Sequence, residues 1–92
     1  MALTKEDAVR QAKGDLARRL GVAESEINED SVEQADFPDA ALGAPVADEM
    51  SAQMITSGWR IRLRAKGTNY EYRASRTAGV RLSNFNGENY RV

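Results

Sequence analysis

Two residue types that carry much of enzyme chemistry are missing from this chain: its 92 residues include no histidine and no cysteine. Without histidine there is no Ser-His-Asp triad, no histidine general base and no imidazole metal ligand. Without cysteine there is no thiol nucleophile, no zinc–thiolate site and no disulfide framework. The chain also lacks a G-x-S-x-G elbow and a phosphate-binding glycine loop. We therefore expect a protein that is not an enzyme and needs no cofactor.

Acidic residues gather in one part of the chain, where they could suggest a cation site. Seven fall within sixteen positions: Glu24, Glu26, Glu29, Asp30, Glu33, Asp36 and Asp39. Ca²⁺ takes several oxygen ligands, but the run contains no D-x-[DN]-x-[DN]-G loop, and nothing places two carboxylates in one pocket for acid–base chemistry. We expect a solvated acidic face and no metal. Asp39 differs, because between Pro38 and Gly43 its carboxylate is suited to accept hydrogen bonds from loop amides.

Arginines alternate with apolar residues in Trp59-Arg60-Ile61-Arg62-Leu63-Arg64, a pattern typical of a half-buried strand. Residues 1–46 carry ten acidic and five basic side chains, whereas residues 47–92 carry four acidic and eight basic ones. A basic sheet face near Tyr70 and Tyr72 could hold single-stranded nucleic acid. We expect both tyrosines on the buried face instead, and no RNP-like motif occurs. Cross-strand pairs with Glu71 are therefore the simpler interpretation of the arginines.

The elements that must position these residues begin with a helix over residues 4–20. Thr4 is a suitable N-cap with Asp7 three residues on, and Gly21 stands where a left-handed C-terminal residue is expected. An apolar stripe follows one side of the helix: Val9, Ala12, Leu16 and Leu20. With 92 residues, 41% of them apolar, and a net charge of −1, the chain is expected to form one domain over residues 1–92.

Strands are expected over 31–37, 59–64, 69–74 and 80–85, with a short one at 88–92. Lys66-Gly67 and Asn86-Gly87 supply hairpin turns. Residues 47–55 fit a strand or a short helix, and we favour an extended segment. Its apolar residues are expected to serve as core or edge cover, with an apolar patch for partner binding as the alternative: Met50, Met54 and Ile55. The predicted fold class is α+β, with the N-terminal helix packed on an antiparallel β-meander of about four strands, in two layers.

Four motifs together resemble those of a family of small, uncharacterised bacterial domains. They are F-P-D-A-A-L-G-A-P at 37–45, G-W-R-I-R-L at 58–63, Y-E-Y-R at 70–73 and V-R-L-S at 80–83. The family carries a W-P-D-x-x-L-G-C-P loop, then G-[WY]-x-I-x-L, Y-E-Y-H and a strand ending in Cys. A helix ending in D-L-A-x-x-L-G-V also fits at 15–22, so the resemblance covers about residues 8–83.

The chain departs from the family pattern at four positions: Phe37 replaces Trp, Arg73 replaces His, and Ala44 and Ser83 replace the two cysteines. Losing both cysteines together is expected if they normally pair. The resemblance therefore predicts that Ala44 and Ser83 are neighbours, with Cα atoms within disulfide range, about 4.4–6.8 Å. It also suggests a reducing compartment or a core that needs no covalent tie.

The function we expect is that of a non-catalytic binding or interaction module using the 37–45 loop, because loops on a rigid scaffold often carry binding. Its candidate binding residues are Phe37, Pro38, Asp39, Leu42, Arg60, Arg62, Arg64 and Arg73. A protease-inhibitor-like role would suit such a loop. The alternatives are nucleic-acid binding through the arginine face and an accessory domain of a bacterial envelope protein. Exposure of Phe37 or Leu42 would favour interaction, and burial of both would favour packing.

The expected partner is a protein rather than nucleic acid, and we expect a monomer or weak dimer. No window of the sequence is apolar enough to span a membrane. The first residues show no basic segment followed by an apolar one, so the sequence as written predicts a cytoplasmic protein. If a leader was removed, the prediction becomes a secreted or periplasmic one.

Overall fold

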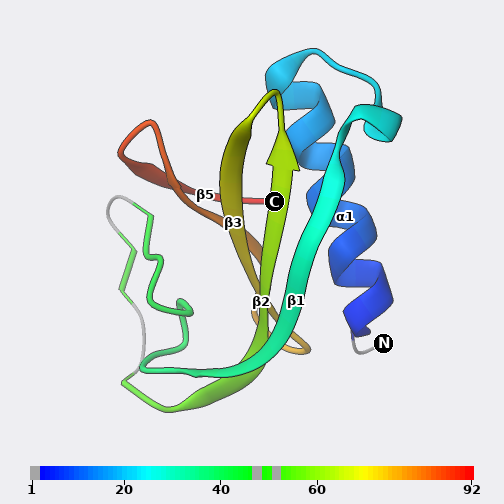
Figure 1. Cartoon of the computed structure of the whole chain (residues 1–92). Coiled ribbons are helices and arrows are strands. Elements are labelled where there is room, and N and C mark those ends of the chain that lie inside the picture. Colours follow the sequence, from blue (N-terminus) through cyan, green and yellow to red (C-terminus); the bar gives the residue numbers. More distant parts are fainter. Residues whose placement is uncertain (1–2, 47–48, 51–52) are drawn as a thin grey trace.

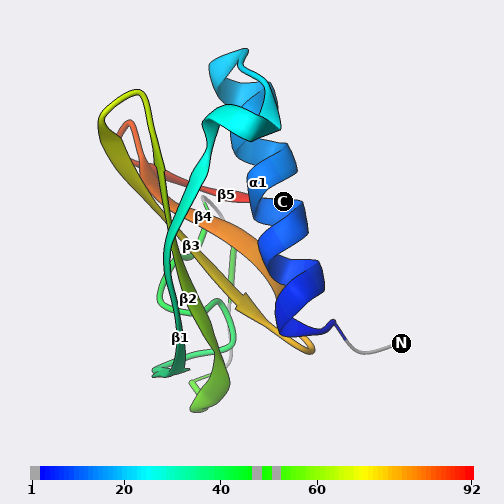
Figure 2. The same ribbon diagram turned by 45° about the vertical axis from the view of Figure 1, so that its right-hand side comes forward.

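A computed structural model describes residues 3–46, 49–50 and 53–92, which form one helix, a short 3-10 turn and a five-stranded sheet (Figure 1). The elements are α1 (Lys5–Leu20), η1 (Glu24–Glu26), β1 (Asn28–Phe37), β2 (Thr56–Ala65), β3 (Thr68–Ser75), β4 (Gly79–Phe85) and β5 (Glu88–Arg91). The sheet order is β1-β2-β3-β4-β5, and each strand is antiparallel to its neighbour. Figure 2 shows α1 along one side of this sheet. The predicted α+β meander is confirmed, with five strands.

The ends of α1 follow the local signals in the sequence. The Thr4 hydroxyl accepts a hydrogen bond from the Asp7 backbone amide at 3.1 Å, which satisfies one free donor of the first turn. Gly21 closes the helix at φ 67°, in the left-handed region. The prediction of a helix over 4–20 is therefore confirmed.

The two hairpin turns have the backbone that their sequences predict. Lys66 and Gly67 have φ values of 51° and 76°, and Asn86 and Gly87 have values of 52° and 85°. Two successive residues with positive φ form the type I′ turn, whose twist matches that of the strands it joins. The turns thus fix the registers in which β2 meets β3 and β4 meets β5.

The core lies between α1 and one face of the sheet. The helix contributes small side chains and one leucine, and the strands contribute larger ones: Ala8, Ala12, Leu16, Ile61, Leu63, Tyr72, Ala74, Val80 and Leu82. Trp59 and Tyr70 pack partly buried against this cluster. The prediction that the tyrosines share the buried face with the apolar residues of β2 is confirmed.

Gly58 opens the G-W-R-I-R-L motif where β2 and β3 approach closely. A side-chain Cβ at this position would lie 2.0 Å from the carbonyl oxygen of Ala74 on β3. No other residue fits without moving a strand, so the glycine is a packing requirement.

The segment before β2 differs from its prediction. Residues 47–48 and 51–52 of the expected 47–55 extended segment lie outside the described residues, and 49–50 and 53–55 form neither strand nor helix. Pairing with β1 begins only at Thr56, opposite Phe37. No helix in the described part of the chain is long and apolar enough to cross a membrane.

Candidate binding surface

The loop after β1 folds back onto the sheet face that α1 leaves uncovered. In Figure 1 this green loop lies on the opposite side of the sheet from the helix. Phe37 is 2% exposed and Leu42 is 0% exposed, so both large apolar residues of the loop motif are buried. Their burial favours a packing role over direct recognition by these two side chains.

Asp39 gives the loop its internal structure. Its Oδ1 atom accepts hydrogen bonds from the backbone amides of Ala41 and Gly43, both at 2.9 Å. Leu42 and Gly43 then take φ values of 59° and 67°, a conformation that is uncommon for a side-chain-bearing residue such as Leu42. The prediction that Asp39 caps loop amides is confirmed, while Pro38 beside it is exposed.

Side chains from three strands hold the loop against the sheet through its carbonyl groups. Arg73 on β3 donates to the Leu42 carbonyl at 3.0 Å, and Arg81 on β4 donates to that of Ala44 at 3.3 Å. Asn89 on β5 donates to the carbonyl of Pro45 at 2.8 Å. The loop is therefore attached at three points to strands that follow it by about 30 to 45 residues in the chain.

Glu49 forms ion pairs with Arg81 of β4 and Arg91 of β5, next to the three hydrogen bonds that hold the loop. Its carboxylate accepts two hydrogen bonds from Arg81, at 2.5 and 2.6 Å, and one from Arg91 at 2.7 Å. The hydrogen bond from Arg81 lowers the pKa of Glu49 most, ahead of the opposing effect of burial, and the pKa falls to about 2. Paired guanidinium–carboxylate hydrogen bonds of this kind are among the stronger ones in proteins.

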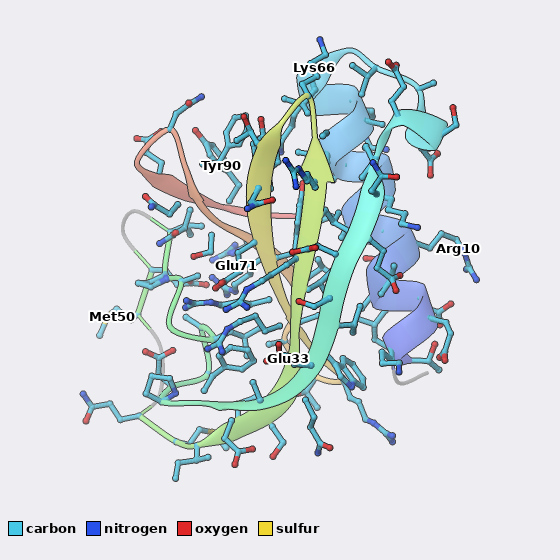
Figure 3. The ribbon with its side chains drawn as sticks, viewed as in Figure 1. Arg10, Glu33, Met50, Lys66, Glu71 and Tyr90 are labelled. Carbon is cyan, nitrogen blue, oxygen red and sulfur yellow. The ribbon has the colours of Figure 1, made fainter. Side chains whose placement is uncertain are left out.

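The arginine row, formed by Arg60, Arg62 and Arg64 of β2, lies beside the loop on the same sheet face. Glu71 on β3 stands between three guanidinium groups, at 3.6 Å from Arg60, 3.8 Å from Arg62 and 2.8 Å from Arg73. Glu33 on β1 lies 3.9 Å from Arg62, and Figure 3 labels both glutamates. The predicted pairs with Glu71 are confirmed, and they partly neutralise the row.

The predicted binding residues of the loop and the predicted binding arginines meet at the Phe37 ring. The guanidinium carbons of Arg60 and Arg73 lie 5.9 and 5.7 Å from the centre of that ring, within cation–π range. Arg64, at the far end of the row, is exposed. Loop and arginine row therefore form one continuous face.

A recess of about 670 Å³ opens at the end of the sheet where β2 begins. Ala40 of the loop lies on its wall, with Gln34 of β1 and Arg76 of the β3–β4 turn. Its apolar lining includes Met54, which is 57% exposed, Ile55, which is 76% exposed, and the partly buried Trp59. Met54 and Ile55 are therefore exposed at the rim of the recess and do not belong to the core.

Residues 9–83 match a family model described as Domain of unknown function (DUF8738). The chain belongs to this family. The match includes the loop, the arginine row and the recess, and it confirms that the chain belongs to an uncharacterised domain family. No curated protein and no solved structure matches the chain.

A buried polar cluster connects two DUF8738 segments that are far apart in the sequence. The Tyr72 hydroxyl donates to the Asp15 carboxylate at 2.8 Å, and Arg19 donates to the same carboxylate oxygen at 2.7 Å. Burial raises the pKa of Tyr72, and the hydrogen bond to Asp15 raises it further. No prediction from the sequence included this cluster, although an aspartate beside Leu16 in the helix stripe is a signal for a buried polar contact.

Ala44 and Ser83 of the DUF8738 chain lie on the same side of the sheet. Ala44 is fully buried, and its carbonyl accepts a hydrogen bond from Arg81. Ser83 is two residues further along β4, so its side chain points to the same face as that of Arg81. Ala44 and Ser83 can be neighbours, as predicted, only if they lie on the same side of the sheet. The distance between their Cα atoms stays a prediction.

Proposed function

We propose that this DUF8738 chain is a non-catalytic protein-binding module whose binding surface is the recess at the start of β2. The observation that carries the proposal is the exposure of Met54 and Ile55 at the rim of a recess of about 670 Å³. Exposed apolar patches next to concave surfaces are typical of interaction sites on small soluble domains. The partner expected here is a protein that inserts an apolar side chain.

In this proposal the 37–45 loop supports the binding surface rather than making the main contact. Phe37 and Leu42 anchor it to the sheet, and Ala40 forms part of the recess wall. A protease-inhibitor-like role has less support, because carbonyl groups that an inhibitor would present to a protease accept hydrogen bonds from Arg73, Arg81 and Asn89 instead.

The recess can be tested with 8-anilinonaphthalene-1-sulfonate, a dye that fluoresces on apolar surfaces. Trp59 is the only tryptophan and lines the recess, so energy transfer from it to the dye reports binding, and loss of the transfer in a recess variant assigns the binding to this place. We expect one bound dye per chain, lost in the Met54→Ser/Ile55→Ser variant. Met50→Ser is the matched control, because Met50 is 97% exposed and projects away from the sheet (Figure 3). Equal energy transfer in both variants would contradict the proposal.

Nucleic-acid binding through the arginine row is the second candidate, and the contacts of Glu71 and Glu33 weigh against it. We expect no retention on single-stranded DNA at physiological salt. Retention that falls steeply with salt, as counterion release requires, would favour this candidate if it disappears in the triple alanine variant. That variant replaces Arg60, Arg62 and Arg64.

A further inference from the structure

β1 is an open edge of the sheet. Among the residues that the structure describes, β2 is the only strand paired with it. The register slips between Glu29 and Ser31 and is then regular over the seven residues from Ser31 to Phe37. An edge strand presents backbone donors and acceptors without partners, to which another extended chain can pair. This stretch is long enough for a seven-residue segment.

The charge on this edge is of one sign. Glu33 lies 3.9 Å from Arg62, and Asp36 accepts a hydrogen bond from Ser57 at 2.9 Å, yet the acidic side chains of β1 are all exposed: Glu29, Asp30, Glu33 and Asp36. Glu24 and Glu26 precede them in η1, and no lysine or arginine stands between Arg19 and Arg60. A second copy of β1 would place two acidic strands side by side, and like charges on neighbouring strands are unfavourable. A basic strand is the occupant that this charge favours.

The edge also leads to the recess. Gln34 of β1 pairs in register with Trp59 of β2, and both residues line the recess. A strand added along Ser31–Phe37 would therefore pass the mouth of the recess. One of its apolar side chains could enter beside Met54 and Ile55.

We propose that β1 takes up an extended, lysine- or arginine-rich segment of a partner protein as a sixth, antiparallel strand. The proposed backbone pairing and the preference for a basic segment depend only on the β1 edge. Only the entry of an apolar side chain into the recess rests on the proposed function above.

The test uses the full chain and a capped peptide of seven alternating lysine and valine residues. Two matched peptides serve as controls. One has proline for each valine, which keeps the charge but removes the backbone donors of those residues, and the other has glutamate for each lysine. Amide chemical shifts and hydrogen exchange of β1, together with Trp59 fluorescence, report where a peptide binds.

We expect the lysine–valine peptide to protect the amides of β1 and both controls to bind at least about tenfold more weakly. Glu33 and Asp36 lie on opposite faces of β1, so the lysines of the peptide can pair with only one of them. The Glu33→Gln/Asp36→Asn variant removes either pair and should bind the peptide up to about fivefold more weakly, because exposed ion pairs contribute modestly. Equal binding of the proline peptide would overturn the proposal, since it would reduce the interaction to charge alone. Dimerisation of the chain through β1, displaced by the peptide, would overturn it as well.

The two proposals can fail separately. If Met54→Ser/Ile55→Ser abolishes dye binding but the peptide leaves β1 unchanged, the recess stands and the strand addition is wrong. If the peptide protects β1 equally in that variant and the dye never binds, strand addition stands and the recess proposal is wrong.

Discussion

The replacement of Ala44 and Ser83 by cysteine tests how the loop sits on β4. The Ala44 carbonyl accepts a hydrogen bond from Arg81. Ser83 is two residues from Arg81 on β4, and its side chain lies on the same face as that of Arg81. If the two positions are neighbours, as the family resemblance predicts, the Ala44→Cys/Ser83→Cys variant will form a disulfide without a shift of the backbone.

The expected gain follows from the length of chain that the bond closes. A bond between positions 44 and 83 encloses about 40 residues, for which the lost entropy of the unfolded chain is about 4 kcal/mol at 25 °C. Ala44 is fully buried, and fitting a sulfur atom there costs about 1 kcal/mol. The remaining gain of about 3 kcal/mol corresponds to a rise in Tm of about 12 °C or more for a domain of this size.

Thiol titration of the native, air-oxidised variant shows whether the bond forms, and thermal unfolding with and without reductant measures its effect. The single variants Ala44→Cys and Ser83→Cys serve as controls for the substitutions themselves. Two thiols that remain titratable after oxidation would refute the placement. A bond that forms but lowers Tm relative to the reduced variant would refute the unstrained geometry.

Three further substitutions probe other contacts. Because the pKa of Glu49 in the folded protein is lowered to about 2 from its usual value of 4.5, its stabilising effect is present above pH 4.5 and is lost as the pH falls toward 2. Tm should therefore drop over this range, and Glu49→Gln should flatten the drop. Tyr72→Phe removes a hydrogen bond to the Asp15 carboxylate and should cost about 2 kcal/mol in urea unfolding. Gly58→Ala forces a methyl group against the β3 backbone and should cost about 2 kcal/mol or more by the same measurement.

The parts of the fold that the sequence predicted are those set by neighbouring residues. Thr4 and Gly21 define the helix ends through contacts within a few residues. Asn86-Gly87 defines a hairpin because its backbone preference suits only a few turn types. The alternation from Trp59 to Arg64 separates the two faces of β2 wherever the strand is placed in the sheet.

The parts that the sequence left open depend on contacts between distant segments. The destination of the 37–45 loop is set by Arg73, Arg81 and Asn89, and no local pattern links these residues to the loop. The exposure of Met54 and Ile55 likewise depends on where β2 begins to pair with β1. The strand propensities of the residues do not specify that position.

The contacts of the loop determine which charged side chains are free to bind a partner. Arg73 and Arg81 use their guanidinium groups to hold loop carbonyls, and Glu71 lies within 4 Å of three arginines. Arg60, Arg62 and Arg73 of the basic face are thus engaged within the domain, although the sequence presents this face as an alternative binding surface. On β1, by contrast, Glu29, Asp30 and Asp36 are exposed beside an open backbone edge. This difference supports the proposal that a charged partner binds at the acidic edge, on the strand that leads into the loop.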